Sequence, residues 1–304
     1  MSGRTELFVN KQPGGMFAVE NMGLGTGSRF YLHAGTGTDS AGFGRNPDSP
    51  VATLDYANGL CTASKGDIIF AMPGHAESLV GATSAVLDVA GVRVIGLGTG
   101  ALRPKFTFTT DAGATISITA PNVSLENLQL LSAFTNGITA GITVGALADG
   151  LRLTNIRMEE SLNTQEFLIA VSIAAACHDV GIDGFEFFGI DGGTDTQCIK
   201  FVGASNYSYV RNFRIFGDWS GTPIDALTAA SLYMEFAHGT IINVDTGAGL
   251  SVSVKSDTTG MMRHLDIAQI KDTVGPAGAA MGATQVLVSN AAFVQGILKP
   301  TADS

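Results

Sequence analysis

Pairs of carboxylates are the residues of this chain whose spacing most directly suggests chemistry. Asp179 and Asp183 flank one short apolar segment, and Asp191 and Asp195 lie close together in the glycine-rich stretch GIDGGTDTQ. Two carboxylates facing each other across a groove can hydrolyse a glycosidic bond. Both pairs also fit solvated corners and loops, and we adopt that structural interpretation.

Other catalytic and ligand-binding patterns are absent from the sequence. Arg152, Arg157, Arg211 and Arg214 occupy outward strand positions without an acidic set in register, whereas a lyase needs a calcium-holding carboxylate cluster beside a basic residue. The 5 histidines and 3 cysteines show no metal-ligand spacing. GLGTG at 96–100 departs from the dinucleotide-binding pattern. We therefore predict no catalytic residue, no metal site and no cofactor.

The elements that would position any site come from a repeat of about 28 residues. Each unit has a short alternating apolar segment, a corner residue and a second alternating segment, and a further strand precedes each unit. Alternation with a period of two predicts strands, and three strands per unit can bury a core only when the units stack. The sequence therefore predicts an all-β parallel β-helix. Its corner residues are Gly96, Asn127, Asn155, Gly184, Asn212, Gly239 and His264.

The asparagine corners have a structural explanation. Asparagine and glycine tolerate the left-handed conformation that a tight bend needs. Asn127, Asn155 and Asn212 recur at equivalent positions, so stacked coils can join their side chains into a hydrogen-bonded ladder. We interpret these asparagines as a structural ladder rather than as ligand-binding residues.

The regions around the repeat divide the chain into four parts. Residues 1–28 are an extended arm, and residues 29–78 form an N-terminal cap whose helix follows Pro50. Residues 79–270 are the β-helix coils. Residues 271–304 break the repeat and close the C-terminal end, which would otherwise be an open sheet edge.

The arm is too short and too rich in glycine to build a core of its own. It is either a floppy terminus or a strap that orders on a neighbouring subunit. In the second case its large apolar side chains are the partner-binding residues. These are Phe8, Met16, Phe17 and Met22.

Composition restricts the partners. A net charge of −10 with only 14% charged residues argues against nucleic acid, which clustered lysines and arginines bind. No uninterrupted apolar run is long enough to cross a membrane, and the N-terminus lacks a signal-peptide pattern. We expect a protein without membrane contact that assembles in the cytoplasm of the producing cell.

The N-terminal cap resembles a known family. FYLHAGTGTDSAGFGRNPDSPVATLDYANGL at 30–60, GDIIFAMPGHAES at 66–78 and GVRVIGLGTG at 91–100 resemble the opening of pectate-lyase-like β-helix proteins carried by tailed bacteriophages as virion components. The resemblance implies a right-handed β-helix and a place in a virion. The chain departs from the tailspike pattern by lacking a large particle-binding domain and a trimerisation domain.

Three functions follow as hypotheses. The first is a non-enzymatic capsid decoration protein on the virion surface, a homotrimer that binds the major capsid protein. The alternative is a tail fibre or tailspike-like protein that binds or cleaves host surface polysaccharide. The third is a cellular carbohydrate-active enzyme, which the missing secretion signal disfavours.

Overall fold

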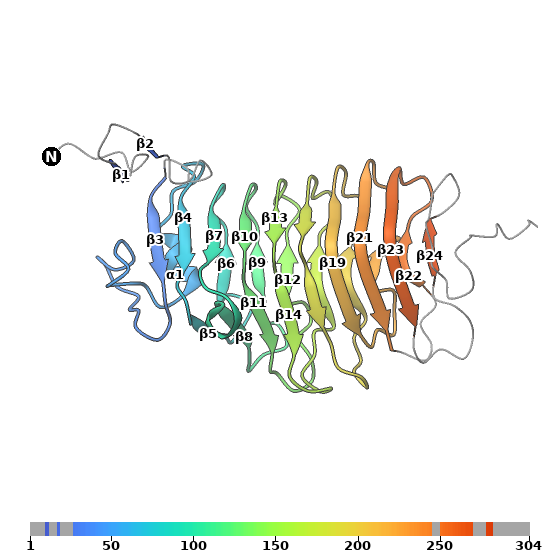
Figure 1. Cartoon of the computed structure of the whole chain (residues 1–304), viewed down its shortest axis with the longest axis horizontal. Coiled ribbons are helices and arrows are strands. Elements are labelled where there is room, and N and C mark those ends of the chain that lie inside the picture. The colour runs from blue at the N-terminus through green and yellow to red at the C-terminus, as the bar shows by residue number, and fades with distance from the viewer. Residues whose placement is uncertain (1–9, 12–16, 19–26, 245–249, 270–277, 282–304) are drawn as a thin grey trace, which may run out of the picture.

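The described part of the chain is one long β-helix. The computed structural model describes residues 10–11, 17–18, 27–244, 250–269 and 278–281. These residues build an all-β parallel solenoid of about 7 turns, and the prediction of a right-handed parallel β-helix is confirmed. Successive coils stack along one axis from the N-terminal cap to the last described strands (Figure 1).

Three parallel faces run along the rod. The first contains β3 (Arg29–Leu32), β4 (Ile68–Ala71), β7 (Arg93–Gly96), β10 (Ser124–Glu126), β13 (Arg152–Thr154) and β16 (Gly181–Asp183). The second contains β5 (Ala76–Leu79), β8 (Lys105–Phe108), β11 (Gln129–Ser132), β14 (Arg157–Glu160) and β17 (Glu186–Phe188). The third contains β6 (Ala85–Leu87), β9 (Ile116–Ile118), β12 (Ile142–Val144), β15 (Ile169–Ile173), β18 (Gln197–Phe201), β20 (Ile224–Ala226), β22 (Leu250–Val254) and β24 (Gly278–Met281).

The first and second faces merge in the later coils. β19 (Tyr209–Gly217), β21 (Met234–Asn243) and β23 (Gly260–Gln269) each run through the corner as one strand, and the pairing skips only the corner residue itself. The longest strands in Figure 1 therefore lie toward the C-terminal end. Short β1 (Asn10–Lys11) and β2 (Phe17–Ala18) pair antiparallel outside this stack.

The corner between the first two faces is a left-handed bend in most coils. Asn127 and Asn155 have φ values of 56° and 52°. In the later coils His238, at 55°, takes the bend that we predicted for Gly239. That prediction was wrong because Gly239 serves packing instead: a Cβ at this position would lie 2.0 Å from the Phe213 ring.

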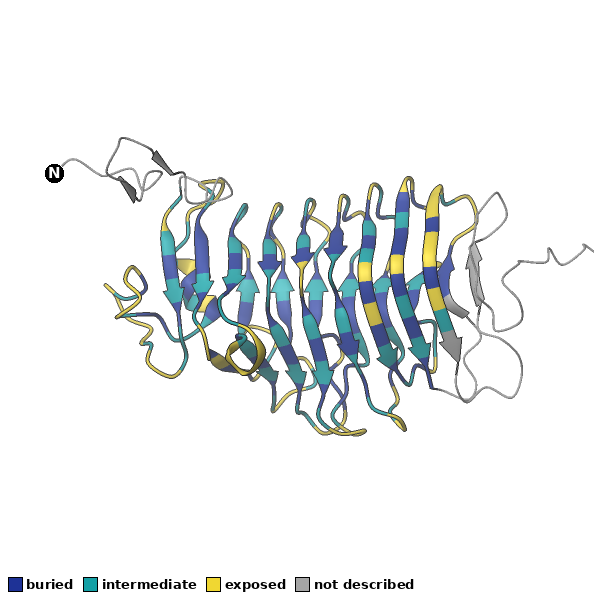
Figure 2. Ribbon diagram, in the orientation of Figure 1, coloured by how far each residue is buried: buried dark blue, intermediate teal, exposed yellow. Residues whose placement is uncertain are grey.

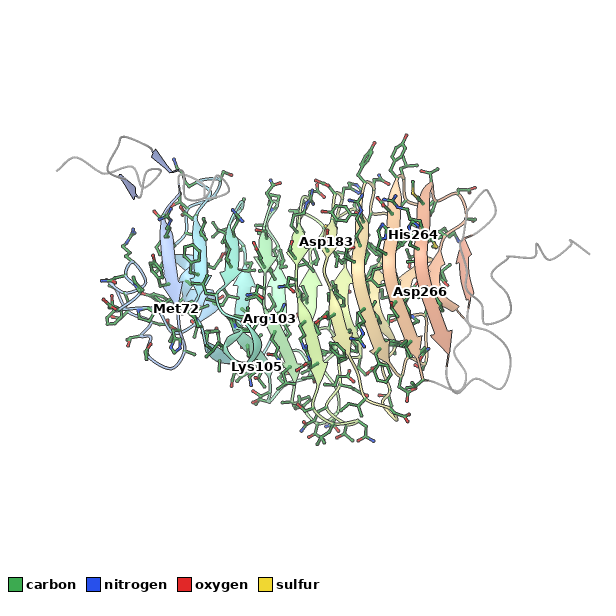
Figure 3. The ribbon with its side chains drawn as sticks, viewed as in Figure 1. Met72, Arg103, Lys105, Asp183, His264 and Asp266 are labelled. Carbon is green, nitrogen blue, oxygen red and sulfur yellow. The ribbon has the colours of Figure 1, made fainter. Side chains whose placement is uncertain are left out.

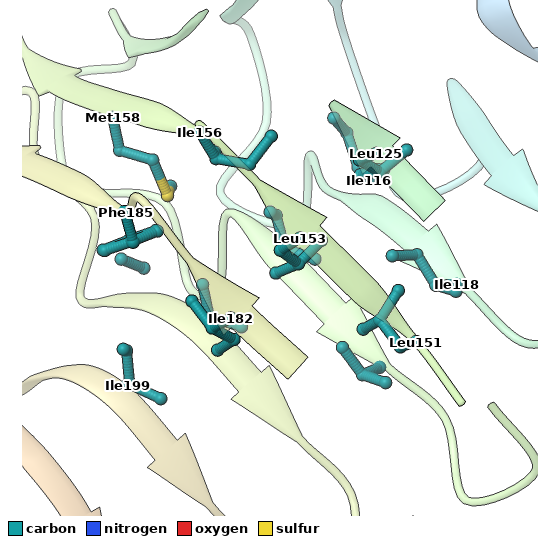
Figure 4. Packing of buried hydrophobic residues seen from close by; sticks show 14 of the residues in the cluster. Ile116, Ile118, Leu125, Leu151, Leu153, Ile156, Met158, Ile182, Phe185 and Ile199 are labelled. Atoms are coloured by element: carbon teal, nitrogen blue, oxygen red, sulfur yellow. The ribbon is translucent and has the colours of Figure 1, made fainter. Parts of the chain in front are cut away.

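The core is the space between the three faces. Inward residues of neighbouring strands stack in register, as Met158, Phe187 and Ile215 do on the second face. All three are fully buried. The buried side of each strand alternates with a half-buried or exposed side (Figure 2), and aliphatic side chains from several faces meet inside (Figure 4). Because parallel strands fix this register, every inward position lies above its equivalent in the next coil.

A short helix covers part of the N-terminal end. Helix α1 (Leu54–Gly59) is shorter than the apolar spacing after Pro50 suggested. Thr53 caps it by accepting a hydrogen bond from the Tyr56 N–H at 3.3 Å. Leu54 and Ala57 on its inner side are fully buried. At the other end, β24 pairs with β22 and extends the third face.

Candidate functional site

A groove lies on the outside of the second face. Its wall includes the short 3-10 turn η1 (Gly100–Leu102), which precedes β8. The groove has a volume of about 330 Å³. Figure 3 labels Arg103 and Lys105 in this region. The residues that line it are Gly100, Ala101, Arg103, Gln129, Arg157 and Glu159.

The strand register brings polar side chains into a row beside this groove. The row runs across five coils, at the first outward position of each strand of the second face and at the equivalent position of β19. From Gln129 onward each member follows its corner by two residues, and this spacing is the sequence signal for the row. Its members are Lys105, Gln129, Arg157, Glu186 and Arg214.

The middle of the groove is an ion-pair network. Arg157 pairs closely with Glu159 on its own strand and lies 3.7 Å from a Glu186 carboxylate oxygen on the next coil. The Gln129 Nε2 donates to the Glu159 carboxylate at 2.6 Å. Gln129 and Arg157 together hold the Glu159 carboxylate in place. The Arg157 guanidinium bridges the carboxylates of Glu159 and Glu186.

Arg103 is a partly satisfied cation in the wall of the groove. Its Nη2 donates to the backbone carbonyl of Asn155. Its Nε is buried without a hydrogen-bond acceptor. Burial is the main cause that lowers the pKa of this arginine. The charge of Glu186 raises the pKa, and the charge of Arg157 lowers it. A guanidinium with an unused donor gains from an added anionic or carbonyl acceptor.

An aromatic ring adjoins the charged row. Phe188 is half-buried and points outward from β17. The Arg157 guanidinium carbon lies 4.6 Å and the Arg214 carbon 5.5 Å from its ring centroid. Rings held beside cations in this way present an apolar surface within a polar site.

The carboxylate pairs expected from the sequence do not meet at the groove. Asp179 forms a bidentate ion pair with Arg152, at 2.8 and 2.9 Å. Asp183 accepts a hydrogen bond from the Asn212 amide at 2.8 Å. Asp191 lies in an exposed loop, whereas Asp195 is completely buried.

The outward arginines do have acids in register, contrary to the sequence interpretation. Glu186 stands beside both Arg157 and Arg214 on neighbouring strands. Glu235 pairs with Arg211 and with Arg263, the latter at 2.8 Å. The sequence analysis missed these pairs because the acids lie one coil away, 24–29 residues along the chain.

The asparagines predicted for the ladder are linked along the axis. The Asn155 amide donates to the Asn127 side chain at 3.0 Å, and Asn127 donates to the carbonyls of Gly96 and Gly98. Asn212 instead donates to Asp183, since Gly184 occupies the corner between them. Of the arm residues, Phe8, Met16 and Met22 lie outside the described residues, as does the side chain of Phe17.

Metal and membrane features are limited in the described residues. Within these ranges no group of three histidine, cysteine or acidic side chains is placed to hold a metal ion. No helix of the described chain is long and apolar enough to cross a bilayer.

Comparison with known proteins gives structural similarity only. No protein-family model and no curated protein sequence matches the chain. Two solved structures of a GH136 lacto-N-biosidase from Eubacterium ramulus, the selenomethionine derivative and the native protein, are similar with a TM-score of 0.46 and 10% identity. The similarity covers 80% and 79% of this chain. The chain spans 56% and 55% of the length of those structures.

The comparison requires one correction. We predicted a protein without enzymatic activity, and the similarity to a glycoside hydrolase contradicts that prediction. The groove described above was also absent from the sequence analysis, which considered only carboxylates close together along the chain.

Proposed function

We propose that this chain recognises and acts on a polysaccharide that carries acidic groups, with the groove as its binding site. The observation that carries the proposal is Arg103, whose guanidinium lies in the wall of a hollow of about 330 Å³ and donates to one backbone carbonyl, that of Asn155. A carboxylate or sulfate on a sugar in the groove would give this guanidinium a charged acceptor.

The surroundings of Arg103 support a charged sugar polymer over a small apolar ligand. Lys105, Arg157 and Arg214 add positive charge along the row, against Glu159 and Glu186. The row crosses five coils and gathers positive side chains on one face of a chain whose net charge is −10. Phe188 supplies the apolar surface on which the C–H face of a sugar ring can stack.

Two carboxylates are available for glycosidic bond cleavage. Glu159 lines the groove and Glu186 lies beside it, and both contact the guanidinium of Arg157. Hydrolysis of a glycosidic bond uses one carboxyl group as acid and another as base or nucleophile. We therefore assign the roles of acid and base to Glu159 and Glu186.

The test measures binding and cleavage together. The full chain is incubated with polygalacturonate and alginate as acidic polymers and with dextran as a neutral one. Affinity electrophoresis measures retention, and a reducing-end assay measures cleavage. Arg103→Gln should weaken binding to an acidic polymer about tenfold, as expected for one charged hydrogen bond of about 1.5 kcal/mol.

Lys200→Gln is the matched control, because Lys200 is half-buried on the third face, away from the groove. It should leave binding unchanged. Reducing-end release that disappears with Glu159→Gln or Glu186→Gln would support the assigned pair. Equal retention of acidic and neutral polymers, or equal effects of Arg103→Gln and Lys200→Gln, would contradict the proposal.

The wider setting stays a prediction. The proposal corresponds to the tail fibre or tailspike-like alternative of the sequence analysis rather than to capsid decoration. A place on a virion, a homotrimer and contact with a major capsid protein remain predictions, to be tested by locating the chain in purified particles.

A further inference from the structure

Three carboxyl groups converge inside the rod, away from the groove. Glu160 is the last residue of β14, Glu166 lies in the following turn, and Asp195 lies in the equivalent turn of the next coil, before β18. Their exposed fractions are 8%, 4% and 0%. Burial of three acids together is costly unless each has a partner or a proton.

The two glutamates have donors from the protein. Glu160 accepts from the Phe167 N–H at 3.0 Å and from the Ile190 N–H at 3.1 Å. Glu166 accepts from the Thr194 N–H at 2.6 Å and from the hydroxyl of the same residue. Each glutamate thus reaches the turn of the next coil, and together they hold the loops 161–168 and 189–196 against each other.

Asp195 has no such donor. Neither of its carboxyl oxygens receives an N–H or O–H from the protein. The groups that face it are Glu160 from β14, Glu166 from the turn, and the Cys198 thiol from β18. Asp218, beyond the loop, accepts from the Gly192 N–H. No lysine, arginine or histidine of the described residues pairs with the cluster.

We propose that Glu160, Glu166 and Asp195 form a carboxyl clasp, closed by a proton on Asp195 that is donated to a neighbouring glutamate, and opened at alkaline pH. A carboxylic acid can donate to a carboxylate, which turns a repulsive contact into a hydrogen bond. Loss of that proton leaves adjacent buried negative charges without a cation.

The titration of the cluster agrees in direction with this geometry. Burial, and then the charges of Glu160 and Glu166, raise the pKa of Asp195 to about 10. Burial raises the pKa of Glu160 to about 7, although the N–H groups of Phe167 and Ile190 oppose the shift. The pKa of Asp195 is higher in the folded chain than the value near 4 expected in the unfolded chain. The stabilisation that this group contributes is therefore fully present below about pH 4 and is lost as the pH rises toward 10.

The test is hydrogen exchange of the full chain between pH 7 and 9, corrected for the intrinsic exchange rate. In the wild type, the protection of loops 161–168 and 189–196 should fall about tenfold per pH unit, because opening releases one proton. Loop 109–115, at the same position of an earlier coil, should keep its protection. A flat profile in the two clasp loops would overturn the proposal.

Asp195→Asn removes the titrating group and keeps a side chain that can donate to a glutamate. It should abolish the pH slope in both loops, whereas Asp191→Asn in the same loop should retain it. If Asp195→Asn does not fold, the wild-type slope still decides the question. Restoration of wild-type protection at pH 9 by millimolar Ca²⁺ would overturn the proposal, because a cation and not a proton would then close the cluster.

Discussion

The neighbouring phenylalanines of β17 allow the register to be tested with one pair of substitutions. Phe187 points inward, is fully buried, and lies 5.5 Å from the Trp219 ring, centroid to centroid. Phe188 points outward toward Arg157 and Arg214. Phe187→Ala should cost about 3–5 kcal/mol, because the stacked coils on either side prevent the cavity from collapsing. Phe188→Ala should cost no more than about 2 kcal/mol, the sum of two exposed cation–π contacts.

Trp219 is the assay for both variants. It is the single tryptophan of the chain and fully buried beside Phe187, so its fluorescence reports unfolding of this coil. Urea titration should show a much lower midpoint for Phe187→Ala than for Phe188→Ala, with the wild type highest. A shift of one residue in register exchanges the inward and outward positions. A larger loss for Phe188→Ala would therefore refute the proposed strand register.

Two further predictions concern the corner ladder and the cysteines. Asn127→Ala should lower the free energy of unfolding by about 2–4 kcal/mol, because it removes three ladder hydrogen bonds and forces alanine to a φ of 56°. Asn127→Gly should lower it by less, because glycine adopts this φ without strain. Equal losses in urea titration would count against the left-handed bend. Burial raises the pKa of Cys61 to about 12 and that of Cys177 to about 11, and it raises the pKa of Cys198 well above its usual value, so thiolates are scarce at pH 8. Native protein should react slowly with a disulfide reagent and urea should expose three thiols; rapid reaction of the native protein would show that these side chains are open to solvent.

The fold was predictable because its signal repeats. Each coil presents the same alternation around a corner, and errors in one coil are corrected by the others. Asn127, Asn155 and His264 were therefore placed at bends correctly. Two predicted corners lack the left-handed bend. Gly96 is the last residue of β7, and the positive φ lies at Gly98. Glycine at 239 suggested a bend, but its missing Cβ makes room for Phe213, and His238 bends the chain instead.

The groove was harder to predict because its residues come from different coils and meet through lateral register. Gln129, Arg157 and Glu186 are adjacent only when strands pair in the observed order. Arg103 reaches the groove from a turn that no repeat specifies, and its contact with Asn155 spans 52 residues. A search for acids that are close in sequence selects Asp179 and Asp191 instead, and neither lies at the groove.

The clasp and the groove share strand β14, which connects the two proposals physically. Glu159 points outward into the groove, and Glu160, the next residue, points inward to Asp195. A strand alternates its faces, so any displacement of Glu160 when the clasp opens also turns the backbone that carries Glu159. Binding of an acidic polymer should therefore weaken at alkaline pH in the wild type and remain constant in Asp195→Asn. The polymer itself keeps its charge over this range, because carboxylates of the usual pKa are already ionised at pH 7.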